Sequence, residues 1–210
     1  MNFRLAVQPE VKYLSQLVAD AFKDYDLYQQ TIGQTFKQAS DFHQFLKRLH
    51  DVHLAASIAK NKVFVLEDGQ QILSVVVLDN ERMPSANMWQ YIQAGGWQLV
   101  PYFIGNQLGK FLTMLDKAEK LPQQKPQTNW HVNLLAVNPV HQGQKIGSRT
   151  LEAFVIPYAK AHGAKTLSLI TNTPRNVSFY QKNQFQVVDE RMLYFNGSQV
   201  SNWSLVRTLT

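Results

Sequence analysis

The 210-residue chain contains no cysteine. A disulfide framework, a cysteine nucleophile and a thiolate metal site are therefore excluded. The chain also lacks any apolar run near the roughly 20 residues that span a bilayer. Residues 1–4, Met-Asn-Phe-Arg, do not begin a basic segment followed by the apolar core of a secretory signal. We therefore expect a soluble, cytoplasmic protein with no membrane partner.

Charged residues are also few, at 17% against 45% hydrophobic residues, which is typical of a globular chain. The formal net charge of +6 suits an anionic ligand such as a nucleotide phosphate. Lys and Arg are scattered, however, whereas a nucleic-acid surface normally shows them clustered. We expect no nucleic-acid partner, and the length favours a single domain over residues 1–210.

The first 80 residues predict two helices followed by a β-hairpin. Both helices have apolar residues at helical spacing. These residues are Val11, Leu14, Val18, Ala21 and Phe22 in the first helix, and Phe42, Phe45, Leu46, Leu49 and Val52 in the second. The second helix is expected to begin at Ser40 as its N-cap. Apolar strands at 62–67 and 72–78 flank Asp68-Gly69, which is a strong hairpin signal.

Three histidines of the second helix, His43, His50 and His53, are candidate metal ligands. Among them, His50 and His53 are close enough on a helix to share an ion, and no carboxylate cluster accompanies them. We interpret the three as ordinary surface or groove histidines and expect no metal site.

Residues 85–121 return to a helical pattern, interrupted at Gly95-Gly96 and Pro101, and residues 122–127 form a connecting loop. A strand at 130–137 then precedes a helix at about 147–162, which Pro157 should kink and Gly163 should end. A strand at 165–171, a helix at 175–183 and a hairpin around Asn196-Gly197 complete the chain. Strands mixed with helices in this way indicate an α/β or α+β sheet domain.

The segment with the clearest chemical meaning is residues 137–148, Val-Asn-Pro-Val-His-Gln-Gly-Gln-Lys-Ile-Gly-Ser. It predicts a strand, a tight glycine-containing loop and the start of a helix. Small residues let a ligand approach the backbone, and the free amides of a helix start favour negative charge such as a pyrophosphate. The segment matches neither the dinucleotide fingerprint nor the Walker loop.

At these residues the chain resembles the GCN5-related N-acetyltransferase (GNAT) superfamily. The family signature is Gln or Arg, two residues, Gly, one residue, then Gly or Ala, and here it falls on residues 142–147. Gln142, Ile146 and Gly147 match, whereas Lys145 replaces the usual glycine. Residues 172–185, Asn-Thr-Pro-Arg-Asn-Val-Ser-Phe-Tyr-Gln-Lys-Asn-Gln-Phe, resemble the second block of the family. The resemblance covers a cofactor-binding core of about 130–190.

The resemblance implies a mixed, mostly antiparallel sheet flanked by helices, with acetyl-coenzyme A as donor and coenzyme A as product. The implied cofactor-binding residues are Leu135, Ala136, Val137, Gln142, Gly143, Gln144, Lys145, Ile146, Gly147, Ser148 and Asn176. An amine would attack the thioester directly, with no enzyme nucleophile. Tyr180 would donate a proton to the leaving thiolate, unless it is simply a core tyrosine.

A base for the acceptor ammonium is harder to assign. Strand alternation predicts His131, Asn133, Leu135 and Val137 on one face, and His131 lies where some family members carry a base. A packed structural histidine is the competing interpretation, with water or an acidic residue as the base instead.

The acceptor, a small-molecule amine or a protein amine, cannot be chosen from the sequence. We expect residues 85–121 to form a wall of its site, or else Trp89, Trp97 and Phe103 to be core. A non-catalytic acyl-coenzyme A-binding or regulatory module of the same fold is the alternative function. A homodimer is possible through a terminal strand at residues 199–208.

Overall fold

The computed structural model describes residues 1–80, 84–102, 107–119 and 129–209. The helices are α1 (Val11–Phe22), α2 (Asp26–Gln29), α3 (Ala39–Ile58), α4 (Met88–Gln93), α5 (Gln107–Glu119), α6 (Ile146–Arg149), α7 (Ile156–Ala161) and α8 (Pro174–Lys182). The strands are β1 (Asn2–Leu5), β2 (Val63–Asp68), β3 (Gln71–Asn80), β4 (Asn129–Val137), β5 (Thr166–Thr171), β6 (Gln186–Phe195) and β7 (Ser198–Thr208).

Over the described residues, seven strands form one sheet in the order β1-β2-β3-β4-β5-β7-β6. The β4–β5 pair is parallel and the other neighbouring pairs are antiparallel. A parallel pair needs a crossover connection, which the helical run from α6 to α7 supplies. The expected mixed, mostly antiparallel sheet flanked by helices is confirmed.

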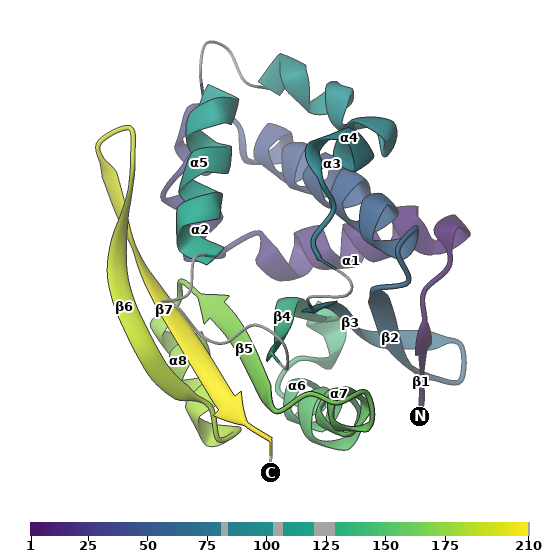
Figure 1. Cartoon of the computed structure of the whole chain (residues 1–210). Helices are drawn as coiled ribbons and strands as arrows, with labels where there is room; N and C mark the ends of the chain where they lie inside the picture. The colour runs from purple at the N-terminus through teal and green to yellow at the C-terminus, as the bar shows by residue number, and fades with distance from the viewer. Residues whose placement is uncertain (81–83, 103–106, 120–128, 210) are drawn as a thin grey trace.

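Helices cover both faces of this sheet (Figure 1). On one face, α1 and α3 pack Leu14, Val18 and Leu54 against Val65 and Leu134 of the strands. On the other face, the α6–α7 run packs its own core, which includes Leu151, Val155, Ile156, Val76, Leu167 and Leu169. Full burial of one such side chain stabilises the fold by about 1.5–3 kcal/mol. The two layers hold the strands from both sides and fix the position of β4 between them.

Both expected hairpins are present, and their turns use left-handed backbone where the sequence has Gly or Asn. Gly69 has φ 61°, and Asn196 and Gly197 have φ 48° and 85°. These are positions that Gly and Asn tolerate better than other residues.

The start of α3 differs from the expectation. The helix begins at Ala39, and its N-cap is Gln38, which has the extended backbone (φ −121°, ψ 138°) of a capping residue. Ser40 lies inside the first turn, where its backbone is already helical, so the prediction of Ser40 as N-cap is wrong.

The crossover helix is continuous from Ile146 to Ala161 but is wider than an α-helix from Thr150 to Val155, where it is a π-helix. Proline has no amide hydrogen, and its ring clashes with the carbonyl four residues earlier. Pro157 follows the π-helical segment, so the expected irregularity is present. Gly163, with φ 87°, ends the helix as predicted.

The terminal strand does not lie at an edge. β7 pairs with β5 over Trp203–Thr208 and with β6 over Ser198–Val206, so most of this strand is already paired within the chain. β6 is the outermost strand, and pairing of residues 199–208 across chains stays a prediction. None of the described helices has the length and apolar character that a bilayer crossing requires.

Candidate active site

The central strands part at the middle of the sheet. β4 pairs with β5 at Asn129–Thr166, Trp130–Leu167 and His131–Ser168, and the two strands then diverge. Asn138 donates its amide to Leu73 on β3. Backbone N–H and carbonyl groups alternate in direction along a strand. Those of Leu135 and Val137 therefore point into the opening, whereas those of Ala136 point to β3. The opening therefore presents the backbone N–H and carbonyl of Leu135 and the N–H of Val137 to any ligand, whereas the Val137 carbonyl accepts a hydrogen bond from Gln142.

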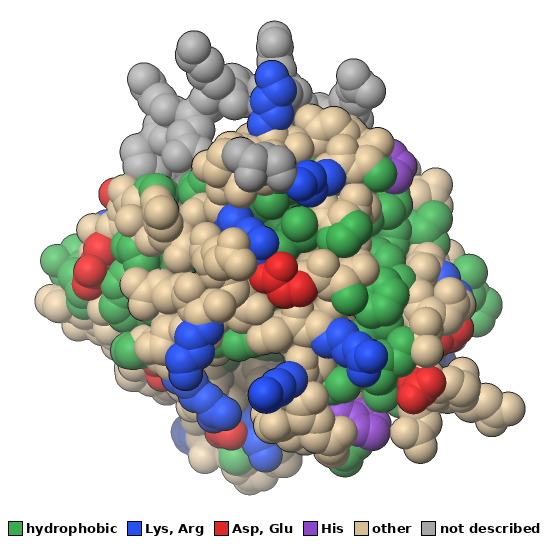
Figure 2. Space-filling view, turned by 90° about the horizontal axis from the view of Figure 1, so that it is seen from below, with side chains coloured by type: hydrophobic (Ala, Val, Ile, Leu, Met, Phe, Trp, Pro, Cys, Tyr) green, Lys and Arg blue, Asp and Glu red, His purple; other side chains and the backbone are tan. Residues whose placement is uncertain are grey.

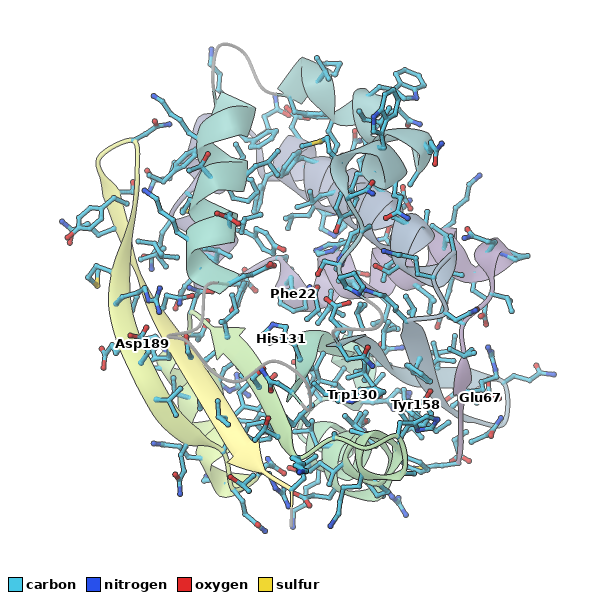
Figure 3. The ribbon with its side chains drawn as sticks, in the orientation of Figure 1. Phe22, Glu67, Trp130, His131, Tyr158 and Asp189 are labelled. Atoms are coloured by element: carbon cyan, nitrogen blue, oxygen red, sulfur yellow. The ribbon has the colours of Figure 1, made fainter. Side chains whose placement is uncertain are left out.

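A β-bulge interrupts β4 beside this opening. Val77 pairs with Leu134 and Leu78 with Val132, so Asn133 is an extra residue in the ladder. The bulge reverses the alternation of side chains. Leu135 packs with the α6–α7 core. His131 instead projects to the α1–α3 side, opposite Trp130, which lies 5.9 Å from Tyr158 between ring centroids (Figure 3). The prediction that His131 shares a face with Leu135 and Val137 is wrong.

The turn after β4 has an unusual backbone. Gly143 and Lys145 both have left-handed conformations, with φ 80° and 59°. The exposed Gln142 donates its side-chain amide to the carbonyl of Val137 at 3.3 Å and so fixes the end of the strand. The helical run begins at Ile146, and its first amides have no intrahelical partner.

Packing beneath the turn holds it against α8. Ile146 is buried with Leu66 and Leu73. A Cβ added to Gly147 would lie 3.0 Å from Cζ of Phe179 and 3.5 Å from Cγ2 of Val137. The structural reason for glycine at position 147 is therefore the close approach of Phe179. This contact brings the start of the crossover helix, the end of β4 and α8 together.

Positive side chains lie on the helices that follow the turn. Exposed Arg149, Lys160, Arg175 and Lys182 lie on α6, α7 and α8. Figure 2 shows Lys and Arg side chains distributed over this face among polar and acidic ones. Such a field attracts an anion, and it is weaker than that of a dense basic patch.

Tyr180 lies on α8 one turn after Asn176, which is half-buried. Its ring is 8% exposed and packs on Phe179 and Phe185, with centroid distances of 4.9 Å and 5.6 Å. Burial raises the pKa of Tyr180 well above its usual value, and nearby Tyr25 adds to the rise. No described residue forms a hydrogen bond with its hydroxyl, which is therefore available to a ligand.

His131 has a defined protonation pattern. Its Nδ1 lies 3.0 Å from Oγ of Ser168, and that hydroxyl donates to the carbonyl of Trp130 at 3.2 Å. The Ser168 oxygen therefore accepts from Nδ1–H, which leaves Nε2 with a lone pair. Burial lowers the pKa of His131, and Asp79 partly offsets this effect.

Asp79 lies in the adjacent strand directly opposite His131. Its carboxylate forms an ion pair with buried Lys62 and accepts hydrogen bonds from Ser85 at 2.7 Å and Asn133 at 3.0 Å. Burial lowers the pKa of His53 on α3, and the charge of Asp79 partly offsets this effect. The charge of Asp79 is therefore compensated but lies close to both imidazoles.

Several ionisable groups on the α1–α3 side have perturbed pKa values or specific hydrogen bonds. Glu119 lies at the end of α5. Desolvation by the surrounding protein raises its pKa to about 7, and the negative charges of Asp79 and Asp116 add to the rise. Half-buried Tyr91 likewise has its pKa raised to about 12, mainly by burial. Tyr25 reaches across to β5, where its hydroxyl accepts the amide of Asn172 at 2.9 Å.

The two tryptophans considered as core are on the surface. Trp89 is 71% exposed and Trp97 is 67% exposed, so the core interpretation is wrong for both. Phe103, named with them, lies outside the described residues. Half-buried Tyr91 and Tyr102 pack inward, and Phe111 of the same segment is fully buried.

His50 corrects the interpretation of the histidines of α3. It is 1% exposed, not at the surface, and lies among Phe22, Tyr28 and His53 with neither ring nitrogen hydrogen-bonded. No group of three His, Asp or Glu side chains in the described part of the chain is arranged to hold a metal ion.

Sequence reasoning missed Asp79, Asn133, Tyr25 and His53 as parts of this site. Their local sequences resemble those of ordinary strands and helices, and only the pairing of β3 with β4 and the packing of α3 bring them together.

Known proteins share both the turn and the fold. Residues 104–187 match the family model described as an acetyltransferase (GNAT) domain. An apo agmatine N-acetyltransferase mutant is 16% identical, with 99% of each chain covered and a TM-score of 0.62. The PaiA N-acetyltransferase of Thermoplasma acidophilum, in complex with coenzyme A, is 13% identical over 99% of this chain and 98% of that one, with a TM-score of 0.57. A polyamine N-acetyltransferase of Drosophila melanogaster is 14% identical over 99% of each chain, with a TM-score of 0.56. No curated protein sequence matches the chain.

Proposed function

The chain belongs to the GNAT superfamily of acetyltransferases, and on that premise we propose that it transfers an acetyl group from acetyl-coenzyme A to a primary amine by direct attack. The observation that carries the proposal is the opening between β4 and β5, which lies beside a turn with left-handed backbone at Gly143 and Lys145.

The residues around the opening suit coenzyme A. The backbone N–H and carbonyl of Leu135 and the N–H of Val137 would pair with the amides of the pantetheine arm, next to Ala136 in the same strand. The turn of residues 142–148 would surround the pyrophosphate with backbone amides. Asn176, on the first turn of α8, would contact the cofactor from the opposite wall. The left-handed backbone at Gly143 and Lys145 supports this role, because it exposes successive amides in a tight turn.

Two side chains would move protons. Acetyl-coenzyme A supplies an acetyl thioester, whose carbon forms a bond to the amine nitrogen as the carbon–sulfur bond breaks. Nε2 of His131 would accept a proton from the acceptor ammonium, as its lone pair and its lowered pKa allow. The Tyr180 hydroxyl would donate a proton to the departing sulfur. The rigid packing of Tyr180 on Phe179 and Phe185 would hold it in place.

The acceptor is proposed to be a small amine. Two of the similar structures are named for agmatine and for polyamines, so small cationic amines are the first candidates.

The test is a panel of amines with release of free coenzyme A thiol as the readout. Agmatine, a polyamine, an arylalkylamine and a peptide with a free N-terminus would cover the main acceptor classes, and calorimetry would measure acetyl-coenzyme A binding separately. We expect turnover of at least one small amine. Tight binding of acetyl-coenzyme A without turnover of any amine would favour the non-catalytic module instead.

A further inference from the structure

The outermost strand, β6, has one edge paired with β7 and a second edge that pairs with no other described strand (Figure 1). The two halves of this second edge differ. Residues 186–191 contain a β-bulge after Val187 and the charged run 189–191, and bulges and charges keep sheet edges from pairing with other chains. Residues 192–195, Met-Leu-Tyr-Phe, have no charge, proline or bulge. An unprotected apolar edge of this kind is a template for another chain.

The unprotected half of β6 also presents backbone hydrogen-bonding groups. The two-residue turn 196–197 has left-handed backbone, so Phe195 and Ser198 close the hairpin as a hydrogen-bonded pair. Hydrogen-bonded and non-hydrogen-bonded pairs alternate along an antiparallel ladder. Met192 and Tyr194 therefore direct their N–H and carbonyl groups away from β7. No backbone group among the described residues bonds with them there.

A groove of about 510 Å³ lies beside this half of β6. Residues 192–196 form one wall, and the exposed face of α5 that carries Lys110 and Lys117 forms the other. Buried Phe111 and Phe195 pack edge to face, with 6.1 Å between ring centroids, and hold the helix on the strand. A helix beside an open sheet edge leaves room for a peptide to add a strand, which is a common mode of peptide recognition.

The groove is positively charged. Lys110 and Lys117 are seven positions apart, or roughly two helical turns, so both lie on the same side of α5. Neither forms an ion pair with a described residue, and no residue that lines the groove is acidic. Lys110 donates a hydrogen bond of 3.4 Å to Oδ1 of Asn196. Met192 and Tyr194, 42% and 66% exposed, add apolar surface. The occupant that complements these walls is an extended chain with carboxylates.

We propose that this groove binds an extended acidic segment of a partner protein, which joins the sheet as an additional strand beside β6. The backbone of the segment bonds to Met192 and Tyr194, and its carboxylates, at alternate positions, face Lys110 and Lys117. A second copy of the chain fits less well. A two-fold axis perpendicular to the sheet at this edge would place the α5 lysines of both copies on the same face, and each copy carries a net charge of +6. The assignment is independent of acetyl transfer.

The experiment measures the Kd of fluorescein-labelled peptides for the full chain by fluorescence anisotropy. Short peptides with Glu at every second position and Val between should bind, more weakly as salt rises, and the same peptides with Lys in place of Glu should not. Lys110→Glu/Lys117→Glu should weaken binding of the Glu peptide by about tenfold or more. Lys12→Glu/Lys165→Glu is the matched control, because it makes the same change of charge outside the groove.

Proline separates strand addition from charge attraction. Tyr194→Pro removes an N–H that points to the free edge and leaves the ladder with β7 in place, because an edge strand tolerates proline at such a position. Tyr194→Ala removes the same side chain but keeps the N–H. The Pro variant should bind the Glu peptide about tenfold more weakly than the Ala variant, the typical effect of one lost hydrogen bond. Circular dichroism checks that both are folded.

Equal Kd values for the folded Pro and Ala variants would overturn the assignment. Equal binding of the Glu and Lys peptides, or binding of neither by the wild type, would also overturn it. A wild-type dimer in sedimentation that Tyr194→Pro converts to a monomer would identify the occupant as a second copy and not a partner protein. If Tyr194→Pro does not fold, the Lys110→Glu/Lys117→Glu variant and its control decide the question.

Discussion

Phe179 lies against Gly147 so closely that a Cβ atom there would come within 3.0 Å of the phenyl Cζ. The contact joins the first turn of the crossover helix to α8, which carries Asn176 and Tyr180. Glycine at position 147 is thus required by packing as well as by any ligand. The two walls of the candidate cofactor site are held at a fixed separation by this pair.

Gly147→Val should therefore destabilise the fold and widen the site. Overpacking of this kind costs about 1–3 kcal/mol, and acetyl-coenzyme A affinity should fall with it. Chemical denaturation and calorimetry measure the two effects. The double variant Gly147→Val/Phe179→Leu should recover part of both, since the smaller side chain makes room. Equal stability of Gly147→Val and wild type would show that Phe179 moves away freely.

Lys145 has the left-handed backbone that glycine adopts most easily, with φ 59°. Lys145→Gly and Lys145→Ala remove the same charge but differ in backbone strain. We expect the Gly variant to be more stable than the Ala variant by about 0.5–1 kcal/mol, after allowance for the greater freedom of unfolded glycine. Both should bind acetyl-coenzyme A equally. An Ala variant as stable as the Gly variant would show that the backbone at residue 145 is not strained.

Tyr180→Phe keeps the ring packed on Phe179 and Phe185 and removes the hydroxyl. If the hydroxyl donates to the leaving sulfur, kcat should fall by about tenfold to a hundredfold, near the lower end of general-acid effects, because a thiolate already leaves readily. Binding of acetyl-coenzyme A and Tm should barely change. Wild-type turnover by this variant, measured where chemistry limits the rate, would remove Tyr180 from the mechanism.

His131→Ala should change the pH dependence of turnover. Burial lowers the pKa of His131, so its base form persists to lower pH than that of a free histidine. The wild-type rate should rise with pH through a pKa below the ordinary value and be level at neutral pH. The variant should be slower and lack this step, while its affinity for acetyl-coenzyme A is retained. Identical profiles would make His131 a structural residue.

His50 makes the fold sensitive to acid. Burial, with a smaller effect of His53, lowers the pKa of His50 to about 3 from an ordinary 6.5. Between these values the unfolded chain binds a proton that the folded chain does not. The contribution to stability is therefore complete above pH 6.5 and declines as pH falls, by roughly 1.4 kcal/mol per pH unit.

His50→Leu removes this titration and two unpartnered buried nitrogens. The variant should be at least as stable as the wild type at pH 7, and its stability should fall less steeply between pH 6 and 4. Denaturation curves across this range provide the measurement. Parallel pH dependence in both proteins would mean that His50 is not the buried neutral group described here.

The local features of this fold were predictable, and the long-range ones were not. The spacing of Val11 to Phe22 predicted α1, and Asp68-Gly69 and Asn196-Gly197 predicted the two hairpins, because periodicity and turn chemistry act over a few residues. The short strand β1 was missed, since four residues carry too little pattern.

The candidate site shows the same division. The turn at residues 142–147 and Tyr180 were found through a contiguous motif. The bulge at Asn133 was not, because it depends on the register between β3 and β4, and a strict period of two then placed His131 on the wrong face. Asp79 and Lys62 are 17 residues apart, and nothing in either local sequence indicates that they pair.

The parting of β4 from β5 has a mechanical consequence. It divides the sheet into two leaves, β1–β4 and β5–β7, whose backbones are joined over the three pairs that end at His131–Ser168. Beyond these pairs, no backbone pairing among the described residues joins the two leaves. A ligand that bonds to Leu135 and to α8 would connect the two sides of the opening. At a hundredfold excess over its Kd, such a ligand raises the free energy of unfolding by about 2.7 kcal/mol. Amide exchange should then slow in both leaves.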